Sequence, residues 1–243
     1  MINTTNIETT NRLRTSTPVD VVIPFYNESG NVFLCHRNTK RLEAFFKIKN
    51  YIYINNGSRD NTLEELKELK KGCEKIQILN IQKNIGYGNG FKKGFERSTA
   101  QIILTNHADQ QFDAFEFYKN IPMLNEGDSI FPIRKLRPVS SAISSLVLRQ
   151  VLSVILNKKL RDFNGQPKLI QKSAIARSLD DFPNDFSFDL ALYLTTPSKK
   201  FYPINERPRI AGHSSWNRGF KSKFVVFKQY ITSSRSLKKL IHQ

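Results

Sequence analysis

The chain has 243 residues, of which 39% are hydrophobic and 24% are charged, and its net charge is +17 at pH 7. This length and composition are ordinary for one globular domain with a full hydrophobic core, and they exclude a disordered or low-complexity chain. Cys35 and Cys73 lie in unrelated segments without metal-ligand spacing, so we expect free thiols in a reducing compartment and no disulfide framework.

Short apolar segments alternate with segments of helical spacing along the first half of the chain. Strands are predicted over residues 19–24, 50–55, 75–81 and 102–106, and helices over residues 62–71 and 88–99. This alternation predicts parallel, right-handed βαβ units with helices on both faces of the sheet. Residues 129–133 favour a further strand, and residues 138–160 favour a long amphipathic or largely apolar helical region.

The ends of the chain differ in composition from the domain between them. Residues 1–17 are polar and lack an apolar segment behind a basic start, so we expect a disordered tail and no signal peptide. A single domain is predicted over residues 18–235, followed by a basic tail over residues 236–243. No run reaches the ~18 apolar residues that a membrane span requires, so no transmembrane anchor is expected.

The positive charge is concentrated near the C-terminus. From Lys199 onward the chain carries eleven Lys or Arg residues and one acid, Glu206. Such a surface attracts nucleic acid, an anionic membrane face or phosphorylated substrates. Alternatively, the basic residues form a solvated surface without a specific partner. No helix-turn-helix pattern, zinc spacing or aromatic RNA-binding signature accompanies the charge, so we expect no nucleic-acid partner.

Polar side chains follow the predicted strands where each strand ends. They lie in the segments Pro24 to Glu28, Asn55 to Ser58, Lys83 to Gly90 and His107 to Gln111. Open α/β sheets bind ligands outside the carboxyl ends of their strands. We therefore expect these four turns to form one site.

Together these blocks resemble the nucleotide-sugar glycosyltransferases of family two, in particular their dolichol-phosphate-mannose-synthase-like branch. The resemblance implies an α/β, Rossmann-like GT-A fold with a mostly parallel central sheet and helices on both faces. A loop near residues 209–214 resembles the family's Arg-x-x-Gly-x-Ser loop, which closes over the donor pyrophosphate. The resemblance implies that the nucleotide-sugar donor is bound by Pro24, Tyr26, Asn27, Glu28, Asn55, Asn56, Ser58, Asn84, Gly86, Ala108, Arg209, His213 and Ser214.

The metal-binding block departs from the family pattern. The family's Asp-x-Asp-x-Gln holds magnesium or manganese, and here His107 replaces the first acid while Asp109 and Gln111 match. Neutral imidazole suits manganese or zinc better than magnesium, so we expect manganese to be preferred or no metal to be strictly required. Alternatively, a protonated His107 with neighbouring basic residues neutralises the leaving diphosphate without a metal.

A last set of matches concerns the acceptor. Arg134, Arg149 and Ser153 correspond to residues that bind the acceptor phosphate in the lipid-phosphate branch, and Asp162 follows them. Two guanidinium groups suit one phosphate because each offers a planar fork of donors. We assign catalysis to Asp109, Arg134, Arg149 and Ser153.

These matches predict an inverting enzyme that transfers a sugar to a polyprenyl phosphate at the cytoplasmic membrane face. An ionised phosphate needs no general base, whereas a hydroxyl acceptor does. The first alternative is transfer to a hydroxyl of a lipid-linked or surface glycan, with Asp162, Asp185 or Asp189 as base. The second is a catalytically silent nucleotide-sugar-binding scaffold, since acids are lost at Asn55, Asn56 and His107. The basic C-terminal segment and the apolar helix predict peripheral binding to an anionic membrane.

Overall fold

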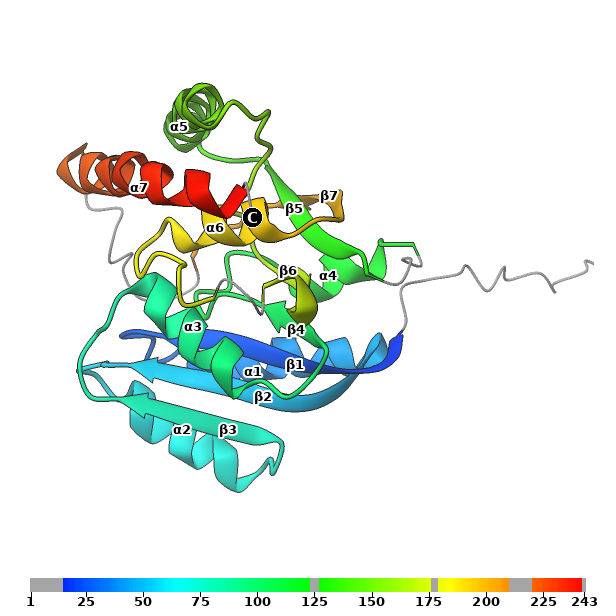
Figure 1. Cartoon of the computed structure of the whole chain (residues 1–243). Coiled ribbons are helices and arrows are strands. Elements are labelled where there is room, and N and C mark those ends of the chain that lie inside the picture. The colour runs from blue at the N-terminus through cyan, green and yellow to red at the C-terminus, as the bar shows by residue number, and fades with distance from the viewer. Residues whose placement is uncertain (1–14, 123–126, 176–178, 210–219, 242–243) are drawn as a thin grey trace, which may run out of the picture.

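The computed structural model describes residues 15–122, 127–175, 179–209 and 220–241. Its first half contains the strands β1 (Thr15–Phe25), β2 (Phe46–Asn56), β3 (Ile76–Ile81) and β4 (Ile102–Thr105) and the helices α1 (Val32–Lys40), α2 (Thr62–Lys71) and α3 (Tyr87–Arg97). Its second half contains α4 (Ala114–Lys119), β5 (Ser129–Lys135), α5 (Val139–Leu156), β6 (Lys168–Gln171), α6 (Phe188–Thr195), β7 (Lys199–Asn205) and α7 (Phe220–Ile241). Figure 1 shows these elements arranged as a sheet between two layers of helices.

The seven strands form one sheet in the order β3-β2-β1-β4-β6-β5-β7. β6 runs antiparallel to both of its neighbours, and the other pairs are parallel. All strands except β6 therefore end at the same edge of the sheet. This arrangement confirms the predicted mostly parallel α/β fold and brings the polar turns to one edge.

Residues of both faces of the central strands are buried, which explains their nearly continuous apolar sequences. Val21 and Tyr53 pack in the core beneath α1, α2 and α4, whereas Val22 and Ile54 pack in the core beneath α3, α5, α6 and α7. A glycine lets α3 approach the sheet, because a Cβ atom at Gly94 would lie 2.3 Å from Cγ1 of Val22.

Several predicted boundaries change in the structure. The helix over residues 62–71 is confirmed as α2, while β1 begins at Thr15, so residues 15–17 belong to the sheet and not to the tail. Residues 1–14 lie outside the described residues. Helix α7 continues to Ile241, so residues 236–241 of the predicted basic tail are helical. Cys35 and Cys73 are free, as predicted.

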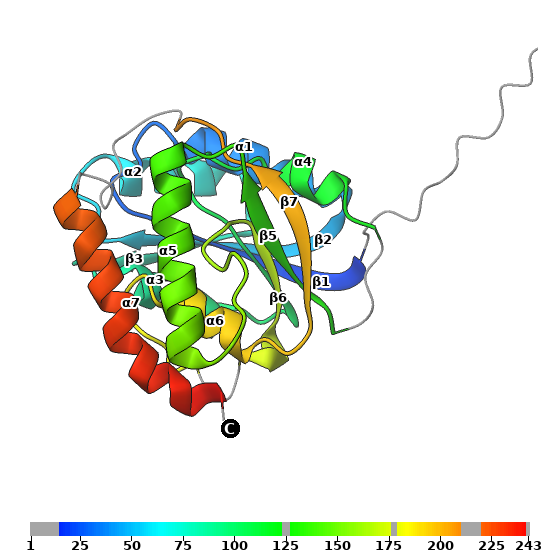
Figure 2. The ribbon, with the colours of Figure 1, turned by 90° about the horizontal axis from the view of Figure 1, so that it is seen from above.

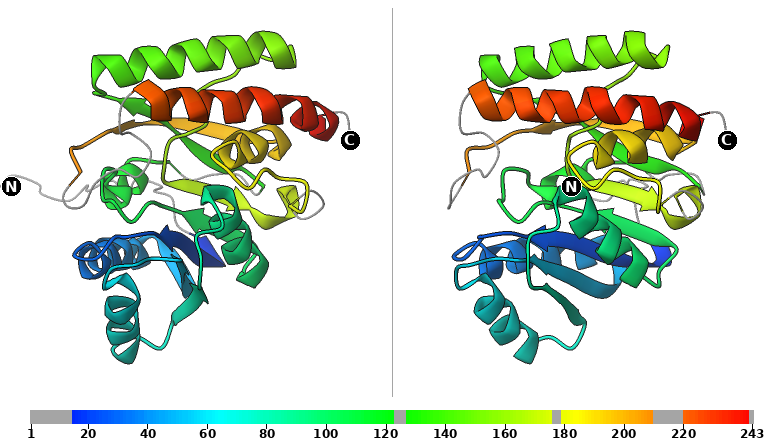
Figure 3. Two further views of the ribbon diagram at one scale, coloured as in Figure 1. Left: turned by 90° about the vertical axis from the view of Figure 1, so that its left-hand side faces the viewer. Right: turned by 60° about the vertical axis from the view of Figure 1, so that its left-hand side comes forward.

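Helix α5 corrects the expectation that no segment is long and apolar enough to cross a membrane. Within the described ranges it is the one helix that meets this criterion by length and composition, with 18 residues and a mean hydropathy of 1.7. Only 17% of it is buried. Figures 2 and 3 show α5 and α7 side by side on the outside of the molecule, over the half of the sheet that contains β5.

Candidate active site

The turns after β1 and β2 are joined by hydrogen bonds at the carboxyl edge of the sheet. Asn27, whose φ is +54°, donates its backbone N–H to Ser58 Oγ at 3.1 Å. Its side-chain oxygen accepts from the backbone N–H of Arg59 at 2.8 Å. The predicted residues Asn27 and Ser58 therefore lie together, beside Pro24 at the end of β1.

The two asparagines at the end of β2 position the neighbouring turns. Asn56 accepts from the Ile85 backbone at 3.2 Å and donates to the Gly86 carbonyl at 3.0 Å. Asn55 donates to the side chain of Asn80 at 2.8 Å. Asn56 thus holds the segment before α3 against β2, and Asn55 bonds to β3, and neither role requires a negative charge.

That segment also approaches the β2 turn closely. Gly57 has a φ of +74°, and a Cβ atom there would lie 2.3 Å from the backbone nitrogen of Asn84. The side chain of Asn84 accepts from the N–H of Gly86 at 2.8 Å. Only glycine at position 57 permits this contact.

Asp109 and Glu28 lie together around one guanidinium group. Arg209 Nη2 donates to Glu28 Oε1 and lies 3.6 Å from Asp109 Oδ2. The other oxygen of Glu28 accepts from Asn31 Nδ2 at 2.7 Å. Burial raises the pKa of Glu28 although Asn31 and Arg209 oppose this shift. Two predicted donor-binding residues, Glu28 and Arg209, are therefore in direct contact, and Arg209 also lies close to the predicted metal ligand Asp109.

His107 belongs to a buried chain of polar groups. Its Nε2 lies 3.0 Å from the hydroxyl of Tyr87, which donates to Asp189 Oδ2 at 2.8 Å, and Lys168 Nζ lies 2.7 Å from Asp189 Oδ1. Tyr87 has one hydroxyl proton, so Nε2 of His107 is the donor in the first bond. Burial lowers the pKa of His107 despite the carboxylates of Asp109 and Asp189. The lowered pKa favours a neutral ring and argues against the alternative of a protonated His107.

The predicted metal ligands do not converge into a metal site. No group of three or more His, Cys, Asp or Glu residues within the described ranges is arranged to hold an ion. Nε2 of His107 donates to the Tyr87 hydroxyl, and the side-chain amide of Gln111 donates to the Arg207 carbonyl at 3.4 Å. Asp109 remains as one carboxylate beside Arg209, so the residues present do not fit the family's metal triad.

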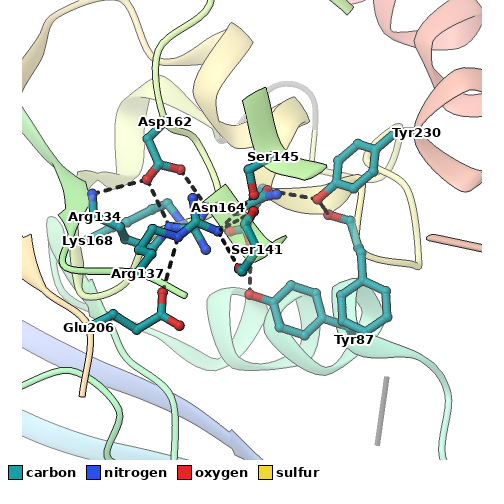
Figure 4. Close-up of polar contacts among 12 residues, drawn as sticks. Tyr87, Arg134, Arg137, Ser141, Ser145, Asp162, Asn164, Lys168, Glu206 and Tyr230 are labelled. Atoms are coloured by element: carbon teal, nitrogen blue, oxygen red, sulfur yellow. Dashed lines mark hydrogen bonds and ion pairs between the residues drawn. The ribbon is translucent and has the colours of Figure 1, made fainter. Parts of the chain in front are cut away.

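Arg134, a predicted phosphate ligand, and Asp162, a predicted base, pair with each other. Arg134 Nε and Nη2 each donate to a different oxygen of Asp162 at 2.8 Å, and the Arg134 backbone adds a bond of 3.1 Å. Burial raises the pKa of Asp162, but the charge and hydrogen bonds of Arg134 outweigh it and hold the pKa below its usual value. Figure 4 shows this pair beside Arg137, which contacts Glu206 and two serines of α5.

A cavity of about 80 Å³ lies between α5, the end of β5 and the loop after α5. The described residues give the guanidinium of Arg149 no hydrogen bond or ion pair. A second, more open cavity of about 660 Å³ continues past Arg149 to Lys158 and Lys159. The first cavity is lined by four arginines, which are Arg134, Arg137, Arg149 and Arg161.

The hydroxyl of Ser153 is used within the fold. It donates to the Arg149 carbonyl at 2.7 Å and accepts from the Leu160 backbone at 3.2 Å. Its one proton is therefore committed to α5, which argues against the predicted role of Ser153 as a phosphate donor ligand. Ser153 instead positions the turn that leads from α5 to Arg161.

The three candidate bases all have partners. Asp162 is paired with Arg134, Asp189 with Lys168 and Tyr87, and the side chain of Asp185 accepts from the Ser187 backbone at 2.8 Å. The other predicted site residues of the C-terminal loop, His213 and Ser214, lie outside the described residues. Tyr26 follows β1, and Ala108 is buried beside Asp109.

The glycosyl transferase family 2 model matches residues 20–175. The chain belongs to this family. CsbB of Bacillus subtilis (strain 168), named provisionally as a glycosyltransferase, is 30% identical over 216 residues, which are 85% of this chain and 63% of that protein. The uncharacterized glycosyltransferase sll0501 of Synechocystis sp. (strain ATCC 27184 / PCC 6803 / Kazusa) is 23% identical over 82% of this chain and 64% of its own length. The chain thus spans less than two thirds of these two relatives.

The fold is shared with solved structures of distant sequence. Glucosyl-3-phosphoglycerate synthase from Mycobacterium tuberculosis, in complex with Mn²⁺, UDP and glucosyl-3-phosphoglycerate, matches with a TM-score of 0.66 and 12% identity over 92% of this chain and 81% of that chain. The same enzyme without these ligands in its description matches with a TM-score of 0.65 and 13% identity. The likeness confirms the GT-A fold.

Sequence reasoning missed three residues of the polar edge. Tyr87 joins His107 to Asp189, Lys168 pairs with Asp189, and Arg137 lines the arginine cavity. Lys168 lies in the short apolar segment of β6, and this could have indicated an ion pair, because a buried lysine requires a charged partner. Tyr87 stands between two glycines in the segment already selected, and Arg137 lies three residues after Arg134.

Proposed function

We propose that the chain transfers a sugar with inversion from a nucleotide-diphosphate sugar to a polyprenyl phosphate at the cytoplasmic face of a membrane. The arginine-lined cavity beside the donor edge is the observation that supports this proposal most strongly. Arg134 is neutralised by Asp162, and Arg137 contacts Glu206. Arg149, together with Arg161 of the same cavity, is therefore the group best suited to an acceptor phosphate.

The state of the carboxylates favours a phosphate acceptor over a glycan hydroxyl. A hydroxyl requires a general base within hydrogen-bond reach, whereas a phosphate is already ionised and attacks the anomeric carbon directly. Asp162 and Asp189 are each in a close ion pair, and Asp185 accepts a bond from the backbone at the start of α6. The main requirement of the reaction is then to stabilise the departing nucleoside diphosphate.

One face of α5 is apolar and exposed. Four residues at helical spacing are between 50% and 82% exposed, namely Val139, Ile143, Val147 and Val154. The opposite face packs Leu148, Leu152 and Leu156 into the core. α7 lies beside α5 and adds exposed Phe224 and Val225. An apolar strip of this kind is typical of a helix that lies in the membrane interface.

The position of Arg149 favours an α5 that lies along the membrane and does not cross it. Arg149 is in the second half of α5 and lines the cavity on the protein side. A spanning α5 would carry this charge into the hydrocarbon region, at a cost of about 2.5–3.5 kcal/mol at the centre. Lys158, Lys159 and Lys228 are exposed near these two helices, and each contributes about 1 kcal/mol near an anionic surface.

The acceptor is tested by product analysis. The purified protein is incubated with radiolabelled nucleotide sugars and either polyprenyl phosphate or a free glycan. We expect label to enter the organic phase with polyprenyl phosphate and one of the donors. Label transferred only to the glycan would support the hydroxyl alternative and contradict the proposal.

Membrane association is tested by flotation with liposomes. The variant Val147→Glu/Val154→Glu should lose binding to anionic vesicles, and high salt should weaken binding of the unaltered protein. Phe33→Glu is the matched control, because Phe33 is 48% exposed on α1, in the opposite helix layer. Equal partitioning of all three proteins into anionic and neutral vesicles would contradict membrane docking through α5.

A further inference from the structure

The guanidinium of Arg209 lies beside two carboxylates of the donor site. Its Nη2 contacts Glu28 and lies 3.6 Å from Asp109, although the segment that carries it follows the last strand of the sheet. The side chains are largely buried, with exposures of 19% for Arg209, 11% for Glu28 and 14% for Asp109. Nε of Arg209 is buried and has no hydrogen-bond partner among the described residues. The guanidinium thus has donors left over at a place where a donor diphosphate would need them.

We propose that Arg209 is the resident cation of the donor site, where it takes the place of a divalent metal ion. In the donor-free state it holds Glu28 and Asp109, and with donor bound its remaining N–H groups donate to the diphosphate oxygens. This inference concerns the donor half of the family 2 site and does not depend on which acceptor is used.

A metal ion and Arg209 compete for the same oxygens. Glu28 and Asp109 are the carboxylates of the described donor edge that converge on one point, and Arg209 already contacts both. Nε2 of His107 is not available as a further metal ligand, because it donates to the Tyr87 hydroxyl. A divalent ion would therefore have to displace the guanidinium, so removal of Arg209 should strengthen ion binding by linkage.

The first experiment measures Mn²⁺ binding without nucleotide, from the electron paramagnetic resonance signal of free Mn²⁺. The unaltered protein should show no saturable binding below millimolar Mn²⁺, and Arg209→Gln should bind at least tenfold more tightly. Adding Asp109→Asn to Arg209→Gln should remove the gain. Arg207→Gln is the matched control, because Arg207 is in the same segment but pairs with Asp113 at 3.0 Å.

The second experiment measures binding of UDP and GDP by calorimetry in excess chelator. Chelator should leave the affinity of the unaltered protein unchanged, whereas Arg209→Gln should lose at least tenfold and recover partly with Mn²⁺. Circular dichroism checks that each variant is folded. The inference is overturned if the unaltered protein binds one Mn²⁺ at micromolar concentration, or if Arg209→Gln binds Mn²⁺ no better than Arg207→Gln.

Discussion

The ion pair between Lys168 and Asp189 predicts a specific pattern of stabilities. The side chains are 0% and 5% exposed, and Tyr87 supplies a further hydrogen bond to Asp189. Removing one partner of a buried pair leaves an uncompensated charge and costs about 3–5 kcal/mol. Because unfolding of a chain of this length shifts by about 2–4 °C per kcal/mol, Lys168→Met should lower the midpoint by about 6–20 °C.

The variant Asp189→Asn should lose less stability than Lys168→Met. Burial already lowers the pKa of Lys168, so in Asp189→Asn the lysine can lose its proton, which places the cost near the lower limit. The double variant Lys168→Met/Asp189→Leu removes both charges and leaves the Tyr87 hydroxyl without its acceptor, at about 1–3 kcal/mol. It should therefore be more stable than Lys168→Met alone.

The measurement is a double-mutant cycle by thermal and urea denaturation, followed by circular dichroism. The double variant is expected to lose much less stability than the sum of the two single losses. Single variants that lose less than about 1 kcal/mol, or losses that add in the double variant, would refute the reasoning that the pair is buried and mutually required.

Three further predictions concern the site residues. Asp109→Ala should abolish transfer while the circular dichroism spectrum is unchanged, and full turnover by the folded variant would contradict its assignment. Asp162 has a lowered pKa in the folded state. Its stabilising contribution is therefore present above the unfolded pKa of about 3.9 and is lost as the pH falls through the folded pKa. Asp162→Asn should lose stability less steeply below pH ~4 than the unaltered protein, and equal slopes would count against the pair with Arg134. His107→Asp adds a carboxylate beside Asp109 and should make activity more dependent on Mg²⁺, measured as the ratio of rates with Mg²⁺ and with chelator; an unchanged ratio would contradict the effect assigned to His107.

The sequence predicts the elements with strong periodicity and the turns with unusual composition. Residues 62–71 combine acidic residues at the start with leucines at helical spacing, and the structure places α2 there. The strand exits at Glu28, Asn56 and Asp109 lie at one edge because parallel strands end together. The antiparallel β6 was not predicted, since a strand of four residues has too little periodicity to indicate its direction.

Contacts between distant side chains are what the sequence could not indicate. Arg134 and Asp162 were selected separately, as a phosphate ligand and as a possible base, yet they bind each other across 28 residues of chain. Ser153 matches a family position, but its hydroxyl bonds within α5. Partners of this kind follow from the packing of the loop after α5 against β5, which no local pattern encodes.

The kinetics of Arg149→Ala beside Asp189→Asn test the central claim, that the acceptor is a phosphate bound by arginine, most directly. Loss of one partner of a buried charged contact costs about 2–5 kcal/mol, so Arg149→Ala should raise the KM for polyprenyl phosphate by at least about 25-fold, at 1.4 kcal/mol per tenfold, with donor binding retained. Gln150→Ala, an exposed neighbour on α5, is the control, and rates are normalised to folded protein. Asp189→Asn should keep substantial turnover. An inactive but folded Asp189→Asn beside an unimpaired Arg149→Ala would contradict the account.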